Sequence, residues 1–514
     1  MFSKGYSWTY AQGTKLHTDQ RMCDMSLACS LRVPHTPRSL AFSPHPAIHH
    51  RLLVGRSCRV LNQPTCCGAA CFTASQSVSQ QDYLQSWTQQ RAKQLQNCRV
   101  DSERDVPVLL SSTSAQAGQT LLSVPESSWI SLQTVRSSPI GSSVEALEPW
   151  LQLALFILFG LADQKSDWSD YLLSLPSSFN VPLLWEEQEL ALLEGTQLLS
   201  TVQGYRDFFD DRWQDLHDNL FSQAPSLFPQ DSFSYNRFLW AVATLRAHVH
   251  APLQGAQVAL VPLADLVQHG RDGNAQWKLQ PAGFGRRQSL LVESKRELRA
   301  GTPLTMDFGH DKTDAQILLD YGVLDADNPQ AGFMLPLALP EGDACYDDKA
   351  DIAELNGLQE SSDFVLHPDQ PPTNELMAFL RLVNISGPDA FLMEALFRNE
   401  VWGHMQVPVS RVNEEAVCQS MIDGCREALR GYPTTIDEDL MLQRDAVTGS
   451  REDLAIRVRL GEKETLDVTL RYFEDRKSKL DRLEYYQERR LKGLGLLDDD
   501  GNNTWDDFFK DSIA

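Results

Sequence analysis

The spacing of apolar residues divides the chain into stretches of different period. From Pro149 to His250 these residues recur at intervals of three and four, which is typical of amphipathic helices. The apolar run from Trp150 to Leu161 predicts a buried helix, because about twenty apolar residues are needed to cross a bilayer. Beyond Asp348 the helical period returns, and we expect a long final helix from about Leu460 to Leu494.

Short stretches that alternate or cluster apolar residues predict strands on both sides of the helical segment. They cover residues 106–112, 119–125, 257–267, 277–283, 287–295 and 303–309. The Gly-Phe-Gly sequence at 283–285 could suggest a phosphate-binding loop, but without a third glycine and a following helix a hairpin turn is the simpler interpretation. Residues 314–322 predict a short helix or turn that ends this region.

These patterns predict an α+β protein with two folded domains. A β-rich core over residues 82–336 holds a helical insert at about 149–250, and an all-α domain follows over residues 345–496. Residues 1–81 are expected to be a separate leader segment, and residues 497–514 an acidic tail.

The leader segment differs from the rest of the chain in charge. Residues 1–81 contain eight Lys and Arg but only two acidic residues, a net charge of +6. Since the whole chain has a net charge of −23, residues 82–514 carry −29. A basic, Ser-rich and acid-poor composition is typical of an organellar transit peptide, and a disordered tail without a targeting role is the alternative. The acidic body argues against general nucleic-acid binding, because it repels phosphate backbones.

Composition also argues against a membrane protein, a metal protein and a disulfide framework. Cys66, Cys67 and Cys71 fall in the leader without a further ligand at metal-binding spacing, so no metal site is expected. The body has only four cysteines, which suits a reducing compartment.

Polar and aromatic residues that could act chemically follow the predicted strands. The sequence LVPLADLVQHG is expected to deliver Asp265, Gln268 and His269 to the end of a buried strand. GTPLTMDFG contains Phe308, and DAQILLDYG contains Tyr321. Each has a structural alternative, since His269 could be a hydrogen-bonded core histidine and Tyr321 an ordinary buried tyrosine.

The order of these motifs resembles the SET-domain protein-lysine methyltransferases of the plastid Rubisco large-subunit type. The resemblance implies a SET fold that binds S-adenosylmethionine (SAM). It places Gln268 and His269 at the Asn-His pair that contacts SAM, Tyr321 against cofactor and lysine, and His248 in the cofactor site. Such chemistry needs no metal or covalent nucleophile, because the enzyme only aligns a neutral amine with a sulfonium methyl and excludes water.

Several positions depart from the family pattern. Gln268 has one methylene more than the family's Asn, and Phe308 keeps an aromatic wall but lacks the hydroxyl of the family's tyrosine. His248 replaces an arginine, so that a permanent cation becomes a titratable ring. The family's glycine-rich cofactor loop is represented before QTLLSVP by Gly118 alone.

The C-terminal region resembles the family's Rubisco-substrate-binding domain, with matches at residues 346–357, 389–404, 431–440 and 480–495. The resemblance therefore implies SAM-dependent methylation of a lysine in a protein of the chloroplast stroma, with the Rubisco large subunit as the leading candidate. The altered positions favour a second hypothesis, a plastid protein-binding module with a degraded active site. A subunit of a larger plastid assembly is a third.

Overall fold

The computed structural model describes residues 79–102, 106–163, 165–248, 258–283, 288–309, 312–325, 328, 332–393 and 400–498. Contacts divide these residues into two compact units. The first unit contains residues 83–334 and 432–465, and the second contains residues 335–431 and 466–498. The predicted leader lies outside the described residues except for its last three, and most of the predicted acidic tail also lies outside them.

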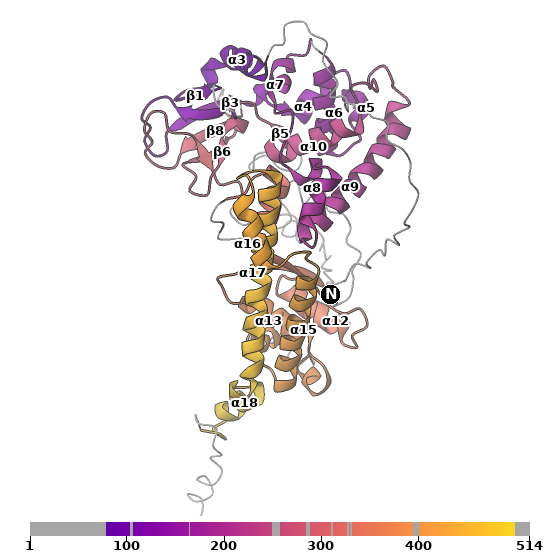
Figure 1. The fold of residues 1–514 in the computed structure, drawn as a ribbon, viewed down its shortest axis with the longest axis vertical. Coiled ribbons are helices and arrows are strands. Elements are labelled where there is room, and N and C mark those ends of the chain that lie inside the picture. The colour runs from indigo at the N-terminus through magenta and orange to yellow at the C-terminus, as the bar shows by residue number, and fades with distance from the viewer. Residues whose placement is uncertain are drawn as a thin grey trace, which may run out of the picture. The chain divides into compact units, whose positions relative to one another are not determined.

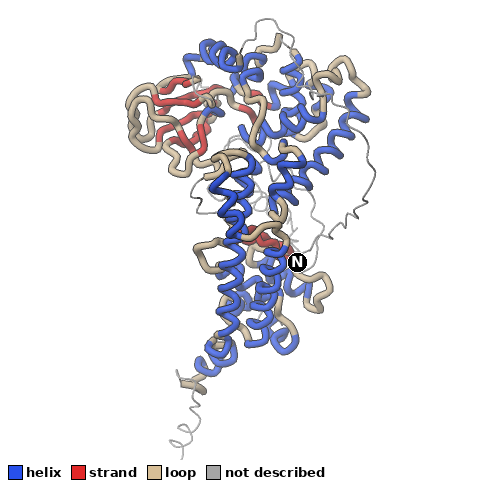
Figure 2. The backbone as a smooth tube through the Cα atoms, viewed as in Figure 1, coloured by secondary structure: helices blue, strands red, loops and turns tan. Residues whose placement is uncertain are grey.

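The strands of the first unit form small sheets rather than one large sheet (Figure 2). A three-stranded antiparallel sheet has the order β3-β8-β7, and the pairs β1-β2 and β4-β5 are also antiparallel. β6 and β9 pair in parallel. The strands are β1 (Cys98–Asp101), β2 (Val108–Ser111), β3 (Thr120–Pro125), β4 (Ile130–Ser131), β5 (Ala259–Leu260), β6 (Gln268–His269), β7 (Ala275–Gln280), β8 (Ser289–Ser294) and β9 (Thr305–Met306). β7 pairs with β8 as a hairpin requires, whereas the predicted Gly-Phe-Gly turn lies outside the described residues after Gly283.

In the first unit, several helices pack against the apolar helix α6 (Pro149–Ala162; Figure 1). Pro149 occupies the first turn of α6, where its missing N–H costs no helical hydrogen bond, and the helix is buried over most of its length, as the apolar run predicts. The other helices up to the site are α3 (Gln80–Gln90), α4 (Leu132–Arg136), α5 (Gly141–Val144), α7 (Ser169–Ser174), α8 (Glu187–Leu190), α9 (Gln197–Leu216), α10 (Tyr235–His248) and α11 (Asp314–Tyr321).

The segment after β5 is not the continuous strand expected over residues 257–267. The strand ends at Leu260, and a 3-10 turn at Ala264–Leu266 separates it from β6. Leu263 enters this turn with φ of 72°, the one positive φ recorded for a residue other than glycine in the described chain. A side chain in this conformation is strained by about 1 kcal/mol or more, so surrounding packing must hold it. The turn redirects the chain so that Gln268 and His269 lie beside β9.

The short helix α11 is defined at both ends by its sequence. The Thr313 hydroxyl caps the first turn by accepting a hydrogen bond from the backbone N–H of Gln316, and the backbone N–H of Thr313 donates to the side-chain oxygen of Gln316. Gly322 ends the helix with φ of 70°. A side chain at Gly322 would meet the backbone of Asn180 and Val181 at 2.9 Å, so glycine is required for both conformation and space.

The second unit is mainly helical, as expected. The remaining elements of the chain are β10 (Phe333–Ala338), which pairs with β11 (Ser361–Leu366), and α12 (Tyr346–Leu355), α13 (Asn374–Val383), α14 (Val401–Met405), α15 (Arg411–Arg430), α16 (Ile436–Asp445), α17 (Arg451–Ser478) and α18 (Tyr486–Gly493). α16 and the first part of α17 belong to the first unit.

The predicted single helix over 460–494 is wrong. α17 ends at Ser478, a 3-10 turn follows at Leu480–Arg482, and α18 begins after Tyr485. The backbone N–H of Tyr485 donates to the side chain of Glu488 at 3.0 Å, a local cap that starts a new helix. The apolar spacing continues across this break, which is why periodicity alone did not reveal it.

The described cysteines are all free, and three of the four are buried. Burial raises the pKa of the Cys98 and Cys425 thiols to about 12 and that of Cys418 to about 11. Among the described residues no single helix is long and apolar enough to cross a membrane. The bent pair formed by α13 and the 3-10 helix Gly387–Met393 passes that test by length and composition only.

Candidate functional site

Three of the predicted site residues meet in one aromatic cluster. Phe308 lies two residues beyond β9, with its ring centroid 5.5 Å from that of His269 and 5.2 Å from that of Tyr321. His269 comes from β6, which runs parallel to β9, and Tyr321 is the last residue of α11. Segments separated by about fifty residues in sequence therefore supply one aromatic surface, as the motifs predict.

The main chain of Phe308 is held on both sides by the other two members of the cluster. Its N–H donates to Nδ1 of His269 at 3.2 Å, and its carbonyl oxygen accepts a hydrogen bond from the Tyr321 hydroxyl at 3.1 Å. Because a backbone N–H can only donate, Nδ1 of His269 is the unprotonated nitrogen. Nε2–H then donates to Oδ2 of Asp325 at 2.8 Å, so both ring nitrogens have protein partners.

A buried charge cluster lies against Tyr321. Nζ of Lys312 donates to Asp320 at 2.5 Å and to the Tyr321 hydroxyl at 3.4 Å, and it lies 4.7 Å from the Tyr321 ring centroid. Arg246 of α10 also binds Asp320. Burial alone would raise the pKa of Asp320, but the two cations outweigh it and lower that pKa. One carboxylate is thus shared by two cations beside the tyrosine.

The same surroundings shift the pKa values of Lys312 and of the neighbouring Tyr321. Burial tends to lower the pKa of Lys312, but the Asp320 carboxylate outweighs this and raises it, so Lys312 stays an ammonium. Burial raises the pKa of the Tyr321 hydroxyl, and the neighbouring Lys312 cation reduces that effect. Tyr321 therefore remains a neutral hydroxyl that can donate a hydrogen bond at ordinary pH.

His248 belongs to a second cluster. Its Nδ1–H donates to the carbonyl oxygen of Thr244 at 3.0 Å, and its ring packs edge-on against Phe179 at 5.6 Å. Asp265 accepts a hydrogen bond from the Tyr171 hydroxyl at 2.7 Å. Burial raises the pKa of Asp265, while the nearby His248 and the Tyr171 hydrogen bond act in the opposite direction.

Asp265 has one buried carboxylate oxygen, Oδ1, without a hydrogen-bond partner in the described part of the chain. Burying an unsatisfied carboxylate oxygen is costly, so such an atom suits a ligand that supplies a donor or a cation. SAM carries an ammonium and a sulfonium, and an acceptor lysine carries an amine. An acceptor oxygen and an aromatic surface both suit ligands that carry these cationic and amine groups.

Gln268 and Gly118, the other positions singled out in the sequence, lie outside the aromatic cluster. Gln268 lies half-buried in β6, with its backbone N–H bound to the carbonyl oxygen of Leu304. Gly118 has φ of 78° in the connection between β2 and β3, and a side chain there would meet open space. Residues 103–105, between β1 and β2 in the sequence, lie outside the described residues. The described residues contain no group of three or more His, Cys, Asp or Glu side chains placed to hold a metal ion.

Sequence reasoning missed the polar residues around the aromatic cluster. Lys312 lies just before the motif DAQILLDYG and Asp320 lies within it, but nothing in their spacing shows that Asp320 binds both Lys312 and Arg246. Arg271 and Asp325 lie on connecting segments without any recognisable pattern. The one sequence feature that could have pointed to Arg271 is its place directly after the motif LVPLADLVQHG, and adjacency of this kind is weak evidence for a role in the site.

Comparisons with known proteins identify relatives of this chain. The profile described as "Rubisco LSMT substrate-binding" matches residues 340–466. The chain is 38% identical over 392 residues to the chloroplastic ribulose-1,5 bisphosphate carboxylase/oxygenase large subunit N-methyltransferase of Nicotiana tabacum, covering 75% of this chain and 79% of that protein. It is 36% identical over 388 residues to the chloroplastic [fructose-bisphosphate aldolase]-lysine N-methyltransferase of Arabidopsis thaliana, covering 75% and 80%.

A solved structure shows the same fold. The crystal structure of the SET domain of LSMT bound to MeLysine and AdoHcy superimposes with a TM-score of 0.74 at 30% identity, over 82% of this chain and 98% of that one. A SET core with a helical insert and a helical C-terminal region is therefore the architecture of this protein. The chain belongs to the SET-domain protein-lysine methyltransferase family of the Rubisco large-subunit methyltransferase type.

Proposed function

We propose that this chain is a SAM-dependent protein-lysine N-methyltransferase. The observation that carries the proposal is the aromatic cluster of His269, Phe308 and Tyr321, and the buried, unsatisfied Oδ1 of Asp265 in the second cluster adds an acceptor. When bound, SAM would supply an electrophilic methyl group, and Gln268, His269, Tyr321 and His248 are the residues that the family resemblance assigns to it.

The chain's own residues would act by orientation and exclusion of water. Phe308 and Tyr321 offer aromatic faces, which attract a cationic or partly cationic amine and shield its hydrocarbon stem. Asp265 can accept a hydrogen bond from a protonated amine. Methyl transfer needs the neutral amine, whose proton passes to water before attack, so that no side-chain general base is required.

The substrate is proposed to be a lysine of a plastid protein in the stroma. The named relatives act on the Rubisco large subunit and on fructose-bisphosphate aldolase, and both of their names are qualified as chloroplastic. The basic composition of residues 1–81 supports import into a plastid. We take the Rubisco large subunit as the leading substrate and aldolase as the second.

One observation favours the alternative function of a protein-binding module. Phe308 has no hydroxyl, and the Tyr321 hydroxyl is already bound to Phe308 and Lys312. A site of this kind could keep its fold and its protein partner while losing the group that guides the amine. This alternative predicts partner binding without methyl transfer.

Calorimetric titration of SAM into the full chain separates the two functions at the first step. Micromolar binding, about −8 kcal/mol, followed by transfer of labelled methyl to Rubisco or aldolase, supports the enzyme. Folded protein that gives neither heat nor thermal stabilisation with SAM, yet still binds one of the two proteins, establishes the module. Arg296→Met serves as a control variant, because Arg296 is exposed and its side chain donates to the carbonyl oxygen of Asp272.

A further inference from the structure

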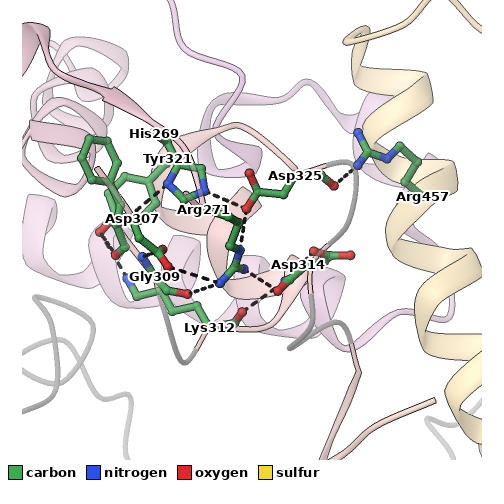
Figure 3. A network of polar contacts seen from close by, with 11 residues as sticks. His269, Arg271, Asp307, Gly309, Lys312, Asp314, Tyr321, Asp325 and Arg457 are labelled. Carbon is green, nitrogen blue, oxygen red and sulfur yellow. Dashed lines mark hydrogen bonds and ion pairs between the residues drawn. The ribbon is translucent and has the colours of Figure 1, made fainter. Parts of the chain in front are cut away.

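Arg271 joins three connecting segments around the site, although no sequence motif marks it (Figure 3). Its Nε donates to Oδ2 of Asp325 at 2.8 Å and its Nη1 to the carbonyl oxygen of Gly309 at 3.1 Å. Its Nη2 donates to Oδ1 of Asn328. The guanidinium is only 17% exposed, so water competes weakly for these bonds.

Asp325 connects Arg271 to the histidine of the aromatic cluster. The same oxygen, Oδ2, accepts hydrogen bonds from Arg271 and from Nε2 of His269, both at 2.8 Å. The side chains of His269 and Asp325 are 7% and 16% exposed. Arg457 of α17 donates to the main-chain oxygen of Asp325, which holds the same residue from a second side.

The hydrogen bonds fix the tautomer of His269. Since Nδ1 accepts from the N–H of Phe308, the neutral ring must carry its proton on Nε2, facing Asp325. Two partners therefore select this tautomer, and any change that frees Asp325 removes one of them. In the other tautomer Nδ1 carries the proton and cannot accept from the N–H of Phe308, so the main chain of Phe308 would be held only through Tyr321.

We propose that Arg271 is a positioning residue for methyl transfer, acting through Asp325 and His269 on Phe308. This inference rests on the proposed function, because it assigns Phe308 to the acceptor side of the active site. Arg271 suits the role better than lysine could. Its planar fork reaches Asp325, Gly309 and Asn328 at once, whereas an ammonium on a flexible stem cannot match that geometry.

The test uses full-length Arg271→Met and two readouts. In long-range ¹⁵N–¹H spectra of the SAM-free protein, wild-type His269 should show an unprotonated Nδ1 and a protonated Nε2. In Arg271→Met this single tautomer should give way to a mixture. With SAM and acceptor protein, kcat should fall about 10- to 100-fold through misplacement of the reacting groups, while KM for the acceptor protein changes by about twofold or less.

Three further variants make the result specific. Asp325→Asn should reproduce the tautomer change, and Arg271→Met combined with Asp325→Asn should be no worse than either alone, because both act through one path. Arg271→Lys keeps the buried charge, so it serves if the methionine variant fails to fold, and it should still lose the single tautomer. Arg296→Met should leave the spectrum and the kinetics unchanged.

A folded Arg271→Met or Arg271→Lys that keeps the wild-type His269 tautomer overturns the proposal, and so does an unchanged kcat. A double variant whose losses multiply also overturns it, since independent effects would then be acting. If the wild-type chain transfers no methyl group, the proposed function has failed, and the tautomer readout still decides whether Arg271 positions His269.

Discussion

The Tyr321 hydroxyl donates a hydrogen bond to the carbonyl oxygen of Phe308 at 3.1 Å, so that the tyrosine holds the main chain of its aromatic neighbour. The same hydroxyl accepts a hydrogen bond from Lys312 at 3.4 Å. In this arrangement the oxygen that could orient an amine is engaged with the protein. The acceptor side of the site therefore depends on the residue at position 308 as much as on Tyr321.

Phe308→Tyr is expected to raise kcat for lysine methylation by on the order of 10², because the new hydroxyl can orient the amine while Tyr321 keeps its structural bond. Phe308→Leu should lower kcat, since the aromatic face is lost. Steady-state kinetics with labelled SAM measures both. Equal rates for wild type and Phe308→Tyr, at equal SAM affinity, would show that the missing hydroxyl does not limit the reaction.

Tyr321→Phe is expected to destabilise the fold by about 1 kcal/mol and to lower kcat. It leaves the carbonyl oxygen of Phe308 without its side-chain donor and Lys312 without one acceptor. Tyr346→Phe is the matched control, because Tyr346 loses an exposed hydrogen bond to Glu360. Urea unfolding and kcat should both distinguish the two variants. Indistinguishable values would contradict the assigned role.

Glu462→Gln should change how stability depends on pH. Burial raises the pKa of Glu462 to about 7, and its Oε2 accepts from the Tyr432 hydroxyl at 2.6 Å and from the N–H of Gln197 at 3.3 Å. The folded pKa lies above the usual 4.5, so wild-type stability falls as pH rises from about 4.5 to 7. Gln mimics the protonated acid and avoids this loss.

The expected gain for Glu462→Gln at pH 8 is on the order of 3 kcal/mol, with little difference from wild type at pH 4. Thermal unfolding across this range measures it. Glu464→Gln, an exposed neighbour on α17, provides the control and should show no such pH dependence. A gain that stays constant from pH 4 to pH 8 would rule out titration of Glu462 as its source.

Asp439→Asn should be strongly destabilising, by about 3–5 kcal/mol. Asp439 is fully buried on α16 and binds Arg459 at 2.7 Å and Lys463 at 2.7 Å. Removing its charge leaves two buried cations without their anion. Urea unfolding measures the loss, and Asp437→Asn, exposed on the same helix, should stay within about 0.5 kcal/mol of wild type.

Sequence predicted those parts of the fold that repeat locally. The buried helix α6 and the short helix within residues 314–322 were both predicted from neighbouring residues. The turn at Leu263 could not be predicted, because leucine has no preference for positive φ and only tertiary packing holds it there. The helix break after Ser478 was hidden because apolar spacing persists across it.

The aromatic part of the site could be predicted from motifs, whereas its polar support could not. His269, Phe308 and Tyr321 were identified by family resemblance and do meet in space. The contacts of Arg271 with Asp325 and Asn328 span more than fifty residues. Pairings of that kind arise from the path of the connecting segments, which no local pattern specifies.

The three buried cysteines are expected to react slowly with oxidants and disulfides. Thiol–disulfide exchange and peroxide oxidation both proceed through the thiolate. With pKa values of about 11 to 12, Cys98, Cys418 and Cys425 remain thiols at any physiological pH. Oxidation and disulfide exchange at these three sulfurs are therefore disfavoured at the pH values of an organelle.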